Sequence, residues 1–174
     1  KYSQLIKDGV TVDEMQGLVQ SVKREILSST ELRYLLVALI AELKDGHVHV
    51  SLRGKGARIL GIRTAAINDR LVVTGLKEPD IVNEENPIAV NDEIIAVDGK
   101  PIEYFKRRNL NYVSNGSIEA REAEALERIL EIPLAIIPPI SDKEVASLTI
   151  RRGDVEFTNQ YKWKDIDPIE LTRS

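Results

Sequence analysis

The most constraining feature of this chain is an unbroken apolar run at residues 94–97 that is enclosed by turn residues. A short apolar run of this kind is typical of a strand buried in a sheet. Asp98-Gly99 follows it directly and indicates a tight reversal, because glycine accepts a positive φ without steric cost. Asn91 precedes the run, and asparagine tolerates the left-handed conformation better than most residues. We therefore expect a core strand with a turn at each end, around which the rest of the chain is arranged.

Other apolar segments predict β-hairpins on both sides of this strand. Asn68-Asp69 separates the members of one hairpin, and Gly153-Asp154 separates those of the other. The segments expected to pair are 58–67 with 70–76, and 148–152 with 155–161. Arg152-Gly153-Asp154 also spells an adhesion tripeptide, but its position between two strands favours an interpretation as turn chemistry.

Helical periodicity dominates the N-terminal part of the chain and returns once in its second half. Thr11 followed by Glu14 forms a capping-box pattern, and Ser28 lies at the break before a second apolar stripe. The segments with helical spacing are 15–26, 32–43 and 118–130. The first two predict a helical hairpin, and the third predicts a helix inside a mainly β region. The fold class expected from this order is α+β.

Composition narrows the function without assigning one. The net charge of −4 gives no electrostatic reason to expect nucleic acid as a partner. With no cysteine, the chain forms neither disulfides nor thiolate metal sites. No apolar run approaches the roughly 20 residues that a membrane-spanning helix needs, so no membrane span is expected. The sequence begins at Lys1 and not at Met, and we expect any signal peptide to lie outside it.

Specific sequence motifs resemble those of a known family. The order of turn, Asp92, Glu93, apolar strand and Asp98-Gly99 resembles the conserved strand of bacterial PDZ domains, although Asn91 stands where a glycine is usual. Upstream, residues 43–47 read Leu-Lys-Asp-Gly-His at the end of a predicted helix. Together with a last hairpin that ends near residue 163, this order resembles the N-terminal part of the tail-specific (C-terminal processing) serine proteases.

The resemblance implies a domain plan and a role. It divides the chain into an N-terminal helical hairpin at 1–52, a PDZ-like β-sandwich or barrel at 53–163 with a helical insertion at about 103–140, and a linker at 164–174 toward a catalytic core. It implies the substrate-recruiting, regulatory part of an extracytoplasmic serine protease, inactive by itself, whose catalytic serine and lysine lie outside this chain. No catalytic residue and no cofactor is assigned here. The alternative is a stand-alone peptide-binding scaffold protein without a protease core.

A PDZ groove binds an extended peptide C-terminus by adding it as a strand beside a helix. The resemblance therefore implies peptide or protein C-termini as partners, along with the protease core of the same parent chain. It places the peptide-binding residues at the start of a strand, at Ile59, Leu60, Gly61 and Ile62. The groove helix is either the segment after residue 102 or residues 118–130. The alternative interpretation is that these apolar residues are ordinary core, since periodicity alone does not separate a groove from a core.

Fragments that look catalytic have simpler interpretations. Ser117 follows a glycine, and Lys55 lies between two glycines, but their order is the reverse of the family's serine and lysine. Serine and glycine gather at helix caps and turns in any case, so we interpret Ser117 as a helix cap and 54–56 as a turn.

The two histidines, His47 and His49, lie two residues apart on a predicted strand and therefore on one face. Asp45 or Glu42 would have to complete a zinc site there. Because zinc needs three or four ligands in defined geometry and no further ligand motif occurs, we assign no metal. His47 is expected to orient the turn between helix and strand.

Overall fold

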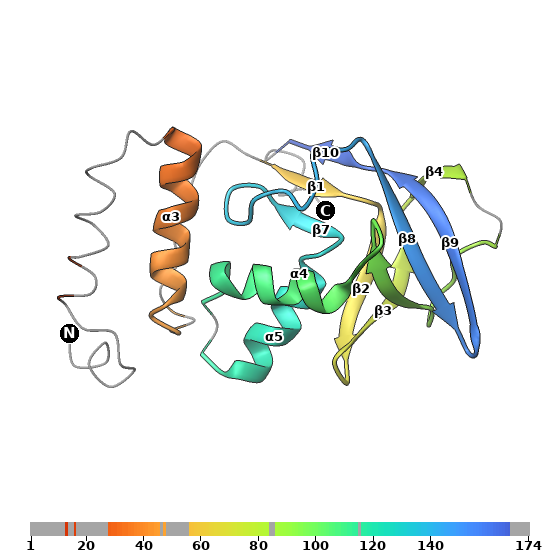
Figure 1. Cartoon of the computed structure of the whole chain (residues 1–174), viewed down its shortest axis with the longest axis horizontal. Coiled ribbons are helices and arrows are strands. Elements are labelled where there is room, and N and C mark those ends of the chain that lie inside the picture. The colour runs from red at the N-terminus through yellow and green to blue at the C-terminus, as the bar shows by residue number, and fades with distance from the viewer. Residues whose placement is uncertain are drawn as a thin grey trace.

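The computed structural model describes residues 13, 16, 28–45, 47, 56–83, 86–114 and 116–167. Figure 1 shows α4 and α5 between α3 and the large sheet. The elements in chain order are α3 (Ser29–Ala41), β1 (Ala57–Ile59), β2 (Ile62–Ile67), β3 (Arg70–Leu76), β4 (Asp80–Asn83), β5 (Glu93–Val97), β6 (Lys100–Pro101), α4 (Ile102–Asn109), η1 (Leu110–Tyr112), α5 (Ile118–Glu127), β7 (Glu131–Pro133), β8 (Val145–Arg152), β9 (Val155–Lys162) and β10 (Lys164–Ile166).

Two antiparallel sheets make up the β part of the fold. The larger, seven-stranded sheet has the order β2-β3-β5-β8-β9-β4, and β6 adds to β5. A smaller three-stranded sheet has the order β10-β1-β7. With helices packed beside these sheets, the protein has the predicted α+β fold.

The strand that was expected to organise the domain lies in the middle of the larger sheet. β5 pairs with β3 on one side and with β8 on the other. Ile94 and Val97 are fully buried, while the residues between them are half-buried. Ile94 and Val97 are three residues apart and would lie on opposite faces of a regular strand. The register shift between Ile94 and Ala96 lets both side chains enter the core.

The predicted turns have the backbone that their residues favour. Asn68 and Asp69 both have positive φ, at 50° and 60°. Asp98 and Gly99 repeat this pattern at 50° and 73°, as the favoured two-residue hairpin turn requires. Asn91 lies at φ 74°, in the left-handed region expected for it. The two predicted hairpins, β2–β3 and β8–β9, are confirmed.

The second predicted helix, α3, begins with the cap that was expected. The Ser28 side chain accepts a hydrogen bond from Glu31 N–H at 3.2 Å, and the Glu31 carboxylate accepts one from Ser28 N–H at 2.8 Å. Tyr34 then ties α3 to the rest of the protein, because its hydroxyl donates to the Leu134 carbonyl at 3.0 Å and its ring meets that of Tyr112 edge-on. Apart from residue 16, the first helix of the predicted hairpin, at 15–26, lies outside the described residues, and so does the Thr11 cap.

Replacing Ser28 by alanine is expected to lower the free energy of local unfolding of α3 by about 1 kcal/mol, since the first turn loses its side-chain acceptor. Hydrogen exchange of the α3 amides measures this opening directly. Ser29→Ala is the matched control, because Ser29 is equally exposed and lies one residue inside the helix. Equal exchange in both variants would contradict the importance of the cap.

The structure differs from the sequence prediction at two strand boundaries. The segment 58–67 is not one strand: it splits into β1 and β2, with Gly61 between them at φ 72°. The predicted linker at 164–174 begins with β10, which pairs antiparallel with β1. A linker starting at residue 164 is therefore wrong, because those first residues complete the small sheet. The predicted domain boundary near residue 52 lies outside the described residues.

Candidate peptide-binding groove

The edge of β2 is the part of the described chain where an extended peptide could add as a strand. Within the part of the chain that the structure describes, β2 pairs only with β3 and forms one edge of the larger sheet. The carbonyl of Gly61 accepts the Lys77 N–H from the β3 side at 2.7 Å. Because successive peptide groups in a strand point to opposite edges, those of Ile62 face away from β3. β2 therefore directs backbone donors and acceptors toward the outer edge.

A helix runs beside this edge. The sequence left two helices open for this place, and α5 is the one that packs on β2, while α4 packs on α5 and on β5. Figure 1 shows α5 next to the β2–β3 hairpin. The strand and helix that a PDZ groove requires are therefore both present, and they are in close contact.

Gly61 makes the bend that leads from β1 into β2. Its φ of 72° lies in the region that side chains other than glycine's rarely adopt. A Cβ atom at this position would lie 2.6 Å from the Lys77 carbonyl oxygen and 3.1 Å from that of Glu78. Both the dihedral angle and the space thus require glycine at the start of the candidate groove.

The four residues predicted to bind peptide do not share one environment. Leu60 is fully buried and Ile62 is 4% exposed, and both belong to the main hydrophobic core. Ile59 lies in β1, where it pairs with Glu131 and Lys164, and so belongs to the small sheet. Leu60, Gly61 and Ile62 form the bend and the first residue of β2, and Leu60 is hydrogen-bonded to the segment just after α5, whereas Ile59 lies before the bend, in β1. Peptide binding by these residues stays a prediction.

Two hydrogen bonds join the helical segment to the start and the end of β2. Leu60 N–H donates to the Leu130 carbonyl at 3.2 Å, just after α5. Ala66 N–H donates to the carboxylate of Glu127, the last residue of α5, also at 3.2 Å. Nothing in the sequence spacing of Glu127 signals this contact with a strand residue 61 positions away.

An ion pair between the buried carboxylate of Asp92 and the exposed side chain of Arg152 holds the turn that leads into β5. Asp92 is 2% exposed, and its carboxylate accepts hydrogen bonds from Arg152 Nε and Nη2, both at 2.7 Å, and from Ala89 N–H at 2.8 Å. Burial alone would raise the pKa of Asp92, but the hydrogen bonds from Arg152 and Ala89 and the charge of Arg152 outweigh burial and lower it. Arg152 of the Arg-Gly-Asp tripeptide thus serves the fold, and Gly153 lies in the expected turn with φ 59°.

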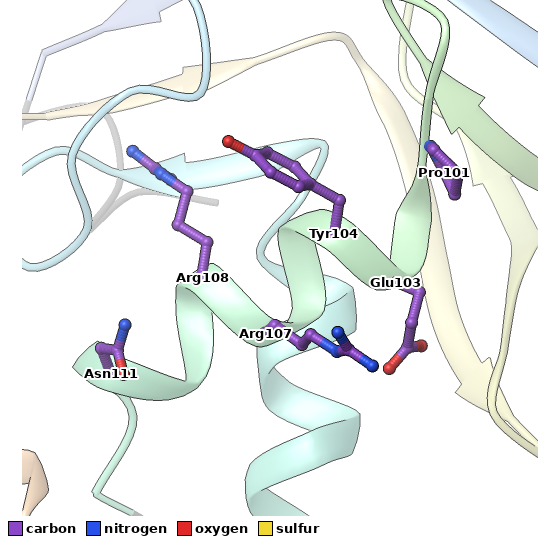
Figure 2. A pocket seen from close by; sticks show the side chains of 6 residues that line it. All are labelled: Pro101, Glu103, Tyr104, Arg107, Arg108 and Asn111. Atoms are coloured by element: carbon purple, nitrogen blue, oxygen red, sulfur yellow. The ribbon is translucent and has the colours of Figure 1, made fainter.

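A shallow hollow of about 540 Å³ lies over α4. Figure 2 shows Tyr104 and Arg108 on one side of the helix and Glu103 and Arg107 on another. Arg108 donates to the carbonyls of Pro138 and Pro139, both at 2.8 Å, so its guanidinium serves to hold a loop. Burial lowers the pKa of Arg108. The remaining lining residues are Pro101 and Asn111.

Two of the residues considered for catalysis and metal binding, Ser117 and His47, have structural partners. Ser117 caps α5, since its hydroxyl accepts the Ala120 N–H at 3.1 Å, as predicted. His47 is exposed, and its Nδ1 lies 3.0 Å from the Asp45 carboxylate. Hydrogen bonds from the backbone and side chain of His47 lower the pKa of Asp45. No cluster of three or more metal-ligating side chains occurs among the described residues, and both His49 and Lys55 lie outside them.

A family model of the PDZ domain matches residues 57–168, which is more than half of the chain and reaches from β1 past β10. The chain is a member of the PDZ domain family. No curated protein matches this PDZ chain in sequence. None of the helices that the structure describes is long and apolar enough to cross a membrane.

Solved structures share the fold of this PDZ protein. The crystal structure of mature CPAF matches with a TM-score of 0.73 and 20% sequence identity, covering 98% of this chain and 33% of that one. Mature CPAF complexed with lactacystin matches with a TM-score of 0.73 and 20% identity, covering 99% of this chain and 34% of that one. The chain therefore spans about a third of the CPAF chains that it resembles.

Proposed function

We propose that this chain is the substrate-recruiting, regulatory PDZ part of a tail-specific serine protease, and that it binds peptide or protein C-termini along β2. The observation that carries the proposal is the outer edge of β2, which begins at the Gly61 bend and has α5 beside it. A peptide added to such an edge gains main-chain hydrogen bonds, and backbone N–H groups at the bend receive its terminal carboxylate.

The protease part of the proposal is supported by the extent of the structural similarity. The fold match to CPAF covers nearly the whole chain but only about a third of the CPAF chain, which leaves room for a separate catalytic core. The catalytic serine and lysine would lie in that core, and we propose an extracytoplasmic bacterial location. The leading alternative is a stand-alone peptide-binding scaffold. A parent sequence without a serine and a later lysine beyond residue 174 would favour the scaffold.

Peptides with an apolar C-terminal residue and a free carboxylate are expected to bind with a Kd on the order of 10 to 100 µM, about −5.5 to −7 kcal/mol. Modest affinity is expected because Leu60 and Ile62 are already buried. The measurement is a titration followed by backbone amide shifts in NMR, with shifts expected along β2 and at Gly61.

C-terminally amidated twins of the same peptides are the matched control, since they differ only in the terminal charge. Equal binding of both forms would show that no carboxylate site exists. Shifts confined to surfaces away from β2 would show that the domain is a structural spacer.

A further inference from the structure

We infer that Glu127 is an internal competitor for the peptide groove: its carboxylate occupies the β2 edge and keeps α5 on the strand until a peptide displaces it. This inference rests on the proposed function and adds the way in which the same site is regulated. The observation behind it is the hydrogen bond between the Glu127 carboxylate and Ala66 N–H at the edge of β2.

The Glu127 carboxylate lies where a carbonyl group of a bound peptide would accept a hydrogen bond from β2. Ala66 N–H points to the outer edge of β2, and its hydrogen bond to Glu127 Oε1 is 3.2 Å long. In strand addition, a carbonyl of the incoming peptide accepts from an edge N–H of this kind. The Glu127 carboxylate therefore already fills one hydrogen-bonding position that a peptide extended along β2 would use.

The apolar floor of the groove is filled as well. Leu60, Leu126 and Leu130 are all fully buried and belong to the same hydrophobic core cluster. The hydrogen bond from Leu60 N–H to the Leu130 carbonyl holds the segment after α5 at the beginning of β2. A terminal apolar side chain can enter only if α5 and this segment move away from β2. The binding-competent arrangement is then a minor state, and the apparent Kd is the intrinsic Kd divided by its population.

Glu127 is suited to release because few other groups hold it. Its side chain is exposed. The neighbouring cation, Arg128 at the C-cap of α5, lies with its Nη2 3.7 Å from the Glu124 carboxylate. Over residues 56–83, 86–114 and 116–167, no salt bridge involves Glu127. Displacing it breaks one hydrogen bond to the strand and returns a carboxylate to water.

The test uses the same chain with Glu127→Ala. Removing the competing acceptor is expected to tighten binding of an apolar-ended peptide about fivefold, which corresponds to roughly 1 kcal/mol. Hydrogen exchange at the Ala66 amide should become faster in the free variant, since its acceptor is gone. Glu127→Gln keeps an oxygen acceptor and should change the Kd less than Glu127→Ala.

Glu124→Ala is the matched control, because it removes one carboxylate from the same helix and leaves the Ala66 contact intact. Its Kd should stay near that of the unmodified chain, and thermal melts should show all variants folded. Wild-type binding with no change in Glu127→Ala would overturn this inference and leave the proposed function standing. Failure of every variant to bind any free C-terminus would overturn the proposed function, and this inference with it.

Discussion

Replacing Asp92 by alanine is expected to lower the free energy of unfolding by about 2 kcal/mol, a large part of the roughly 5–15 kcal/mol typical of a domain. The substitution leaves the Arg152 guanidinium and the Ala89 N–H without their buried acceptor. This loss is smaller than that of a broken buried pair, because the Arg152 side chain is 47% exposed and water solvates its charge once Asp92 is gone. Denaturant unfolding at neutral pH measures the change.

The same pair makes stability depend on pH on the acid side. The pKa of Asp92 is lowered in the folded protein, so its contribution is complete above the ordinary carboxyl pKa of about 3.9 and is lost as pH falls through the lower folded value. Asp92→Asn should therefore flatten the fall in stability below about pH 4. Asp142→Ala, which removes an exposed carboxylate, is the control. An equal loss of stability in Asp142→Ala would contradict the assigned role of the pair.

Replacing Gly61 by alanine is expected to cost about 3 kcal/mol of stability and to abolish peptide binding. Part of this cost, about 1 kcal/mol, comes from placing a side chain at positive φ. The rest comes from the new Cβ atom, which would lie 2.6 Å from the Lys77 carbonyl oxygen and push β2 away from the end of β3. Unfolding curves and the peptide titration measure both effects.

Gly99→Ala separates the two contributions. Gly99 has almost the same φ, 73° against 72°, but a Cβ atom there would meet nothing within 4 Å. We expect it to cost only the conformational part, about 1 kcal/mol, and to leave peptide binding intact. Equal losses at Gly61 and Gly99 would show that the contact with Lys77 is unimportant and that the bend tolerates a side chain.

The positions of the turns and the start of the second helix could be predicted from the sequence. Asn68-Asp69 and Asp98-Gly99 adopt the positive φ angles that their residue types favour. Ser28 forms its capping box with a residue three positions away. Such features are local, because the groups that interact are close in the chain and few conformations satisfy them. The apolar strand at 94–97 lies between Asn91 and Asp98-Gly99, and the PDZ fold was predicted from the resemblance of this order to a strand of bacterial PDZ domains.

Only the tertiary structure decided which residues form the candidate groove and what occupies it. Leu60 and Ile62 were equally consistent with groove or core, and the structure buries both in the main hydrophobic core. The Ala66–Glu127 and Asp92–Arg152 contacts join residues about sixty positions apart. Such contacts depend on which strand becomes the edge of the sheet and which helix packs on it, and hydrophobic periodicity reports neither. The sequence by itself determined the turns, the α3 cap and the core strand, while the long-range packing determined the state of the site.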